Sequence, residues 1–214
     1  MWRKLRAIVG TAGLVGLGGA SSVNCFASKL AMIDDLTAKK TMQKVAVFGN
    51  AGAGKSTLSQ QIATITNLPL HILDRVQYQP GGVAVSSQEY KQAHAEILAS
   101  EQWVIDGFGS IDTLWLRLDR ADTLVYLDLP LPLHFWRVTK RMITGFFVPP
   151  SGWPEHSPIL KSSLNSYRNL WLCHRKLTPK YRDYVAQAAK TRRVYHLRSP
   201  AQVEKFLESI AHAL

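Results

Sequence analysis

The sequence predicts an α/β fold, a five-stranded parallel sheet flanked by helices, because short apolar runs alternate with longer helical stretches. The five runs cover residues 44–48, 70–74, 103–107, 123–129 and 194–197. A glycine-rich turn follows the first run, and aspartates stand near the carboxyl ends of the next three. Ligands of open parallel sheets bind beyond the carboxyl ends of the strands, so we expect the functional site there.

The first run leads into the strongest motif of the chain. Residues 49–56 follow the pattern G-x-x-x-x-G-K-S, between a predicted strand and a helix that we expect over residues 55–66. A nucleotide-binding phosphate loop requires this context. Its glycines permit positive φ and bring backbone N–H groups close to phosphate oxygens. The helix directs its positive end at the same place.

The phosphate loop predicts ATP and Mg²⁺ as ligands. Lys55 is placed to bridge the β- and γ-phosphates, the Ser56 hydroxyl to bind Mg²⁺, and Thr57 to contact the α-phosphate. A glycine-rich turn that arose by chance would not combine all the motif positions with a strand before them and a helix after them. The predicted nucleotide-binding residues of the loop are Gly49, Asn50, Ala51, Gly52, Ala53, Gly54, Lys55, Ser56 and Thr57.

Turn and cap signals delimit the remaining elements. Residues 67–69, which end in proline, close the first helix before the second strand. A serine at position 86 or 87 is placed to cap a helix over residues 86–100. Pro200 opens a final amphipathic helix that we expect to run to Leu214.

The aspartates near the strand ends are candidates for separate roles. Asp106 ends an apolar strand and precedes a glycine, so we expect it to hold Mg²⁺ through water. Asp74 ends the second strand beside the expected acceptor pocket, where a carboxylate can accept a proton from an attacking hydroxyl or orient that hydroxyl. Asp128 precedes a proline, and we expect it to cap the next helix rather than to join the site.

Composition limits the protein to one globular domain, with or without a tail. Of the 214 residues 46% are apolar and 19% charged, which excludes a disordered, collagen-like or repeat protein. Two cysteines cannot build a disulfide framework or a cysteine-rich zinc site, and they suit a reducing compartment. No apolar run reaches the roughly 18 residues of a membrane span. We therefore expect a cytoplasmic protein without membrane attachment.

Residues 1–41 precede the domain that we expect over residues 42–214. A basic start and an apolar run over residues 7–20, followed by small residues, are the layout of a secretory signal peptide. An exported protein would meet little ATP, however, and Met42 stands just before the first strand. We therefore favour an over-extended start, with Met42 or Met32 as the initiator. An organellar or export sequence is the alternative.

The net charge of +11 is concentrated in one block. Residues 134–193 contain twelve Lys/Arg and two acids, whereas residues 42–133 are slightly acidic. Such a block suits an acidic partner, namely nucleotide phosphates, nucleic acid or an anionic surface. The alternative is a solvated basic helix face without a partner.

The motifs together resemble the nucleotide-kinase branch of the P-loop NTPases, the adenylate-kinase-like proteins. Within that branch the chain looks most similar to the bacterial proteins labelled DNA topology modulation proteins. The resemblance covers nearly everything from Gln43 to the last helix. It rests on G-N-A-G-A-G-K-S-T at 49–57, H-I-L-D at 71–74, W-V-I-D-G at 103–107, L-R-L-D-R-A-D-T-L-V-Y-L-D-L-P at 116–130, W-R-V-T-K-R at 136–141 and L-R-S-P at 197–200.

The resemblance implies a P-loop kinase with a short lid around residues 142–160. Arg137 and Arg141 match the lid arginines of such kinases, which clamp the transferring phosphate. Their spacing puts both guanidinium groups on one helix face. Arg198 belongs to the segment that matches the loop along the adenine ring, where backbone contacts dominate.

One departure from the resemblance concerns the acceptor. Adenylate kinases usually read D-G-F-P-R after the third strand, where the arginine grips the acceptor's phosphate, but residues 106–110 read D-G-F-G-S here. A phosphate-bearing acceptor ordinarily meets bidentate arginines. The sequence therefore favours a hydroxyl acceptor without phosphate, held by Asp74. The arginines that remain available nearby are Arg75, Arg117 and Arg120.

Two functions compete for these observations. The first is a kinase that transfers the γ-phosphoryl group of Mg·ATP to a nucleoside, a nucleotide or a similar small hydroxyl compound. The second is a nucleic-acid-associated ATP-binding protein or ATPase that binds nucleic acid through the basic residues 162–193. The salt dependence of binding distinguishes the two functions, because affinity for a phosphate backbone falls steeply with salt concentration whereas the affinity of a closed pocket for ATP changes little. We favour the kinase, since the motor motifs of a helicase are missing.

Overall fold

The computed structural model describes residues 42–79, 82–145 and 159–212, without the side chains at 141, 145 and 159–166. The expected extension over residues 1–41 and most of the expected lid tip lie outside the described residues. The chain from Met42 to Leu214 is one compact unit. No described helix combines the length and the apolar character that crossing a membrane requires.

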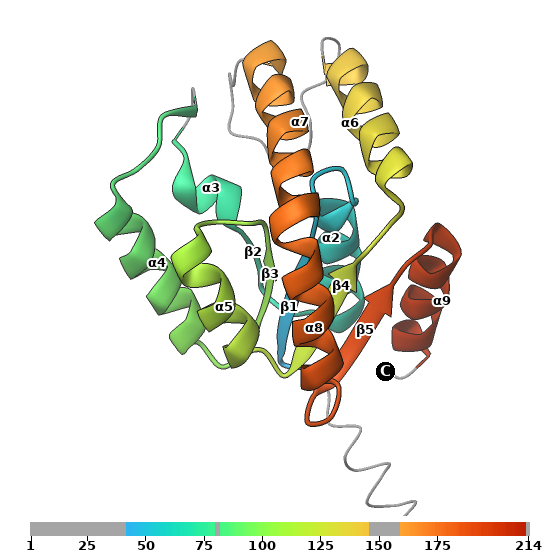
Figure 1. Ribbon diagram of the computed structural model, residues 1–214. Coiled ribbons are helices and arrows are strands. Elements are labelled where there is room, and N and C mark those ends of the chain that lie inside the picture. The colour runs from blue at the N-terminus through green and yellow to red at the C-terminus, as the bar shows by residue number, and fades with distance from the viewer. Residues whose placement is uncertain (1–41, 80–81, 146–158, 213–214) are drawn as a thin grey trace, which may run out of the picture. The chain divides into compact units, whose positions relative to one another are not determined.

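The described residues form a sheet of five parallel strands in the order β2-β3-β1-β4-β5 (Figure 1). This confirms the predicted architecture. Because β1 lies between β3 and β4, the chain first fills one side of the sheet and then the other, and ligands of such sheets bind at the point of reversal. The strands are β1 (Lys44–Gly49), β2 (Leu70–Ile72), β3 (Trp103–Asp106), β4 (Thr123–Leu127) and β5 (Arg193–Leu197).

Helices cover both faces of the sheet (Figure 1). One face packs against α2 (Lys55–Thr66) and α9 (Pro200–Ala211). The other packs against α4 (Ser87–Ala99), α5 (Ile111–Arg120) and α8 (Thr178–Ala188). The central strands are therefore buried on both sides, which explains why their sequences read as continuous apolar runs.

Three further helices stand at the carboxyl end of the sheet. These are α3 (Leu73–Gln77), α6 (Leu131–Gly145) and α7 (Ile159–Lys176), and α6 packs beside α7 (Figure 1). After a break of one residue at Leu177, the chain continues from α7 into α8. Because α7 leads into α8, it connects the carboxyl end of the sheet to one of its covered faces.

The second strand is shorter than predicted and does not include Asp74. Its pairing with β3 ends where Ile72 lies opposite Asp106, the last residue of β3. An edge strand cannot extend its ladder beyond the end of its only partner, so the chain turns into α3 at Leu73. Asp74 therefore lies in the first turn of a short helix and not at a strand end.

The predicted cap of α4 is confirmed and can be tested. Glu89 N donates to Ser86 Oγ at 3.2 Å, and Ser86 N donates to Glu89 Oε2 at 3.0 Å. Replacing Ser86 by Ala removes one of these bonds, and we expect the free energy of unfolding in urea to fall by about 1 kcal/mol. Ser87→Ala, one residue into the helix, is the control; equal losses in both variants would contradict the capping role.

Candidate active site

The phosphate loop connects β1 to α2 and has no room for a side chain at two of its glycines. Gly49 has φ +142° and Gly52 has φ +71°, values that residues with a Cβ rarely adopt. A Cβ on Gly49 would collide with the carbonyl oxygen of Leu127, and a Cβ on Gly52 would lie 2.8 Å from that of His134. The loop therefore packs directly against the end of β4 and against α6.

Two side chains of α6 bind carbonyl oxygens of the loop. His134 Nδ1 lies 2.8 Å from Ala51 O, and Arg137 Nη1 donates to Ala53 O at 2.8 Å. Burial lowers the pKa of His134 below its usual 6.5. Its Nδ1 carries the hydrogen, because a carbonyl oxygen only accepts. These bonds fix the backbone of the loop.

Asn50 and Lys55 form the remaining hydrogen bonds of the loop described here. Asn50 is buried, its Nδ2 donates to Leu170 O of α7 at 3.0 Å, and its Oδ1 accepts from Ala51 N at 2.7 Å. Lys55 Nζ donates to Asn50 O at 2.9 Å, so the ammonium group lies over the loop. The Asn50 side chain thus anchors the loop to α7.

The first turn of α2 carries no cap from a side chain. Its N-cap residue, Gly54, is left-handed, and no side chain of the described residues accepts a hydrogen bond there. The N–H groups of this turn and the positive end of the helix are therefore suited to an anion. Ser56, in the same turn, lines a cavity of about 630 Å³, called the main cavity below. Its neighbour Thr57 lines a smaller cavity, of about 430 Å³.

A cavity of about 630 Å³ opens beside the loop, at the carboxyl ends of β1 and β3. Three parts of the chain line it. The loop contributes Lys55 and Ser56, the start of α3 and the end of β3 contribute Asp74 and Asp106, and α7 with the start of α8 contributes the third wall. The structure therefore brings together the predicted phosphate loop and both predicted carboxylates.

Asp106 occupies the predicted position as the last residue of β3 and is only 2% exposed. Its Oδ1 has no hydrogen-bond partner among the described residues, although buried carboxylate oxygens normally have one. Asp74 lies on the adjoining segment, because its Oδ1 is 3.6 Å from the position that a Cβ would take on Gly107. Asp106 is thus suited to a ligand outside the chain.

Arg117 is not available to an acceptor, contrary to expectation. Its side chain is fully buried, and its Nη2 donates to Gly107 O at 3.0 Å and to Phe108 O at 3.4 Å. Its guanidinium group therefore holds the backbone of the two residues that follow Asp106. Arg75 and Arg120 are exposed and do not belong to the lining of the cavity.

Two lysines that we assigned only to the basic block line the cavity instead. Lys176 ends α7 and Lys180 lies in the first turn of α8. On α7, Asn169, Leu172 and Lys176 all line the cavity, and this spacing of three and four residues places them on one helix face. This spacing could have placed Lys176 on the same face as Asn169 and Leu172 from the sequence, once a helix over these residues was assumed.

The remaining predicted residues lie at other cavities or outside the described part. Arg137 lines a cavity of about 430 Å³ together with Thr57 and Pro200. Arg198 lines a different cavity, of about 470 Å³, so the structure does not bring its side chain together with that of Arg137. Arg141 lies one turn beyond Arg137 on α6, and its side chain is outside the described residues.

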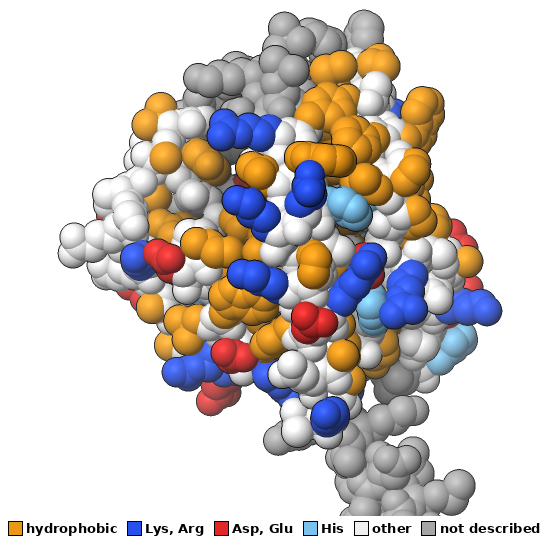
Figure 2. Space-filling view, in the orientation of Figure 1, with side chains coloured by type: hydrophobic (Ala, Val, Ile, Leu, Met, Phe, Trp, Pro, Cys, Tyr) orange, Lys and Arg blue, Asp and Glu red, His pale blue; other side chains and the backbone are white. Residues whose placement is uncertain are grey.

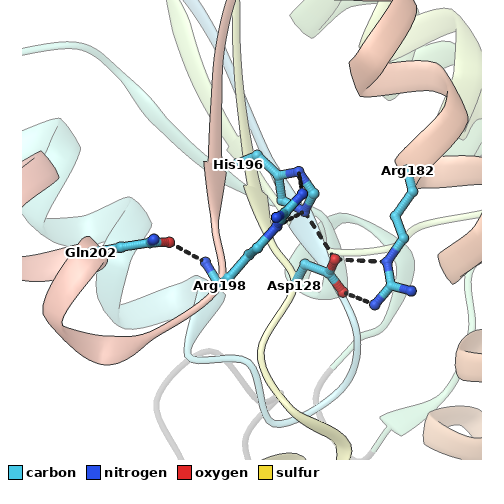
Figure 3. A network of polar contacts seen from close by, with 5 residues as sticks. All are labelled: Asp128, Arg182, His196, Arg198 and Gln202. Atoms are coloured by element: carbon cyan, nitrogen blue, oxygen red, sulfur yellow. Dashed lines mark hydrogen bonds and ion pairs between the residues drawn. The ribbon is translucent and has the colours of Figure 1, made fainter.

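Asp128 is the centre of a polar network that sequence reasoning missed (Figure 3). Arg182 donates to both of its oxygens, from Nε at 2.8 Å and from Nη2 at 3.0 Å, and His196 Nε2 lies 2.9 Å from Oδ2. Arg198 lies against the His196 ring, with Nη2 3.3 Å from Nδ1. We expected Asp128 to cap α6, but its carboxylate instead ties the end of β4 to β5 and α8.

Comparison with known proteins shows the fold. No family model and no curated protein matches the chain. The structure is similar to the shikimate kinase from Acinetobacter baumannii in complex with shikimate, with a TM-score of 0.50 and 15% identity, over 82% of this chain and 94% of that one. An unliganded sugar kinase from Janibacter sp. HTCC2649 gives a TM-score of 0.42 and 15% identity, over 80% and 91% of the two chains. The first similarity shows that the chain has the P-loop kinase fold.

The Asp128 network makes a prediction about acid stability. Burial raises the pKa of the Asp128 carboxyl, but hydrogen bonds from Arg182 and His196 outweigh burial and hold it below its usual 3.8. A carboxyl whose pKa is lower in the folded chain adds stability that is present above pH 3.8 and is lost as the pH falls through the folded-state value. Asp128→Asn should therefore unfold at lower urea concentration than the wild type at pH 7, and the difference should narrow below pH 3.8.

Two arginine variants separate the stabilisation by the Asp128 network from the effect of removing any surface charge. Arg182→Gln leaves a carboxylate with a side chain only 7% exposed without its bidentate partner, and we expect a loss of about 1 to 2 kcal/mol at pH 7. Arg193→Gln removes a looser pair, 3.9 Å from Asp122, and should cost less than about 1 kcal/mol. Equal losses in the two variants would contradict the special position of Asp128.

Proposed function

We propose that the protein is a kinase that transfers the γ-phosphoryl group of ATP to a hydroxyl group of a small acceptor. The observation that carries the proposal is the shared cavity, in which the phosphate loop, Asp74 and Asp106 line one space. Many protein classes use a phosphate loop. A phosphotransferase also needs room for the acceptor and a carboxylate beside it, and this cavity offers both.

The loop and its neighbouring cavity suit ATP. Lys55 and the N–H groups of the first turn of α2 would bind the phosphates, because they lie where an anion is favoured and no side chain caps the helix. The cavity of about 430 Å³ begins at Thr57 in the same turn and extends to Pro200 at the start of α9. It would hold the sugar and base, with Pro200 rather than the side chain of Arg198 as the contact.

Mg²⁺ fits Ser56 and Asp106. Hydroxyl and carboxylate oxygens are the donors that Mg²⁺ prefers, both residues line the main cavity, and the Oδ1 of Asp106 lacks a partner among the described residues. Ser56 would bind the ion directly and Asp106 through water. The ion supplies neutralisation of the charge on the phosphates.

The transfer itself needs few groups of the protein. The acceptor hydroxyl oxygen forms a bond to the γ-phosphorus, the bond from that phosphorus to the β–γ bridging oxygen breaks, and ADP leaves. Asp74 takes the hydroxyl proton or orients the hydroxyl for attack. Lys55, with Arg137 and Arg141 from α6, stabilises the charge on the group in transfer.

The nucleic-acid alternative loses part of its support in the basic block. Arg182 is bound by Asp128, Arg192 donates to carbonyl oxygens at the end of α5, and Arg193 pairs with Asp122. Two lysines of the block line the cavity. The adenylate-kinase-like type and the DNA topology modulation type both stay predictions, and the salt dependence of DNA binding would test the latter.

The kinase proposal predicts labelled products. ATP carrying a labelled γ-phosphate is incubated with pools of nucleosides, nucleoside monophosphates, sugars and small hydroxy acids. We expect label to enter at least one pool, and Lys55→Ala to lower the transfer by at least about 100-fold because it removes a charge that stabilises the transition state. Lys190→Ala, an exposed lysine outside the cavity, is the matched control.

A binding measurement separates Mg²⁺ from the transfer step. Mg·ATP should protect the wild type and Lys190→Ala against thermal unfolding, and Asp106→Asn should need more Mg²⁺ for the same protection. Free phosphate as the only labelled product with every pool would contradict the kinase and favour an ATPase.

A further inference from the structure

Lys176 and Lys180 are the two described cations of the basic block that line the main cavity, and neither has an acidic partner among the described residues. Arg182, Arg192 and Arg193 each form an ion pair with an aspartate. Neither lysine lies within 4.0 Å of a carboxylate among the described residues. Both line the main cavity instead. Both lysines therefore adjoin a space that a ligand can occupy.

Packing holds the two lysines on the acceptor side of the cavity. Tyr181, next to Lys180, is 1% exposed, and its ring centroid lies 5.8 Å from that of Trp115 on α5. This contact fixes the start of α8 beside α5, and the first turn of α5 contributes Ile111 to the cavity. Figure 2 shows Lys and Arg side chains along α7 and the start of α8, with few acidic ones among them.

The charges of the cavity divide between two ligands. Lys55 serves the phosphates of ATP and Asp106 serves Mg²⁺ in the proposed function. The lysine pair remains, on the same cavity as Asp74, to which the proposed function gives the acceptor hydroxyl. A hydroxyl group needs no cation, and two ammonium groups without a counter-charge repel each other. The remaining charges therefore match an acceptor that is itself an anion.

Apolar side chains define the rest of the acceptor's surroundings. Phe108 is 41% exposed, Ile111 48% and Leu172 40%, and all three line the cavity. Large apolar side chains exposed within a concave site are typical of places where the carbon skeleton of a small molecule binds. The cavity thus offers one place each for a hydroxyl, a carbon skeleton and a negative charge.

We propose that the acceptor is a small hydroxyl compound with an anionic group, a carboxylate or a phosphate monoester, and that Lys176 and Lys180 bind this group. This rests on the proposed kinase function and widens the expectation of a hydroxyl acceptor without phosphate to acceptors that carry an anionic group. That expectation came from the missing arginine after β3; the cations come instead from the end of α7 and the start of α8.

The test compares acceptors that differ by one charge. The pairs are nucleosides with their monophosphates, sugars with their sugar phosphates, and polyols with the corresponding hydroxy acids. Wild type, Lys176→Gln, Lys180→Gln and the double variant are assayed, with Lys190→Gln as the control. We expect the wild type to prefer one class of anionic acceptor. The double variant should raise KM for that acceptor about 10- to 100-fold, with KM for ATP unchanged and uncharged acceptors unaffected.

Two results would overturn the role of the lysines and leave the kinase standing. The first is the absence of a lysine-dependent anion preference: the wild type prefers uncharged acceptors, or the double variant keeps the preference for anions. The second is an effect of the double variant on ATP: its KM for ATP rises, or its kcat falls equally with every acceptor. The second result would place the lysines on the phosphates of ATP.

Calorimetry in the presence of Mg·ADP covers the case in which no acceptor is phosphorylated. Binding of one anionic compound from the panel, lost in the double variant and kept in Lys190→Gln, would support the lysine site while the kinase function fails. Absence of anion-selective binding to the wild type would refute the lysine site as well.

Discussion

Gly52 of the phosphate loop packs so closely against α6 that no side chain fits between them. A Cβ at this position would lie 2.8 Å from the carbonyl oxygen of His134 and 2.9 Å from a methyl carbon of Val138. His134 and Arg137 bind the loop on the same side. Because α6 follows β4 directly, this contact also fixes the segment between β4 and α6. The geometry of the anion-binding backbone thus depends on a helix that begins about 80 residues later.

The loop is joined to α7 as well, since Asn50 Nδ2 donates to Leu170 O. Lys55 Nζ in turn donates to the carbonyl oxygen of Asn50. Lys176, at the end of the same helix, lines the main cavity. Two hydrogen bonds and one helix therefore join the ammonium group of Lys55 to the wall of the cavity that carries Lys176. In the kinase that we propose, a phosphate that attracts Lys55 away from Asn50 O would act on this connection.

The phosphate loop, the five strands and the cap of α4 could be predicted because their signals are local, each contained within a few consecutive residues. The roles of Arg117 and Asp128 could not. Arg117 is buried because α5 packs on the sheet, and Asp128 finds partners 54 and 68 residues away. Asp74 lines the cavity beside the phosphate loop but lies in α3 and not at a strand end, since the length of β2 depends on where β3 ends.

The basic block illustrates why charge must be located in space before it is interpreted. Along the sequence its cations form one continuous feature, which is typical of a surface for nucleic acid. In the fold three of its arginines join β4, β5, α5 and α8 through aspartates, whereas two of its lysines line the cavity. Arg182, Arg192 and Arg193 have their counter-charges within the chain. Lys176 and Lys180 have none among the described residues and line the main cavity, so the anionic acceptor that we propose would balance them beside Asp74.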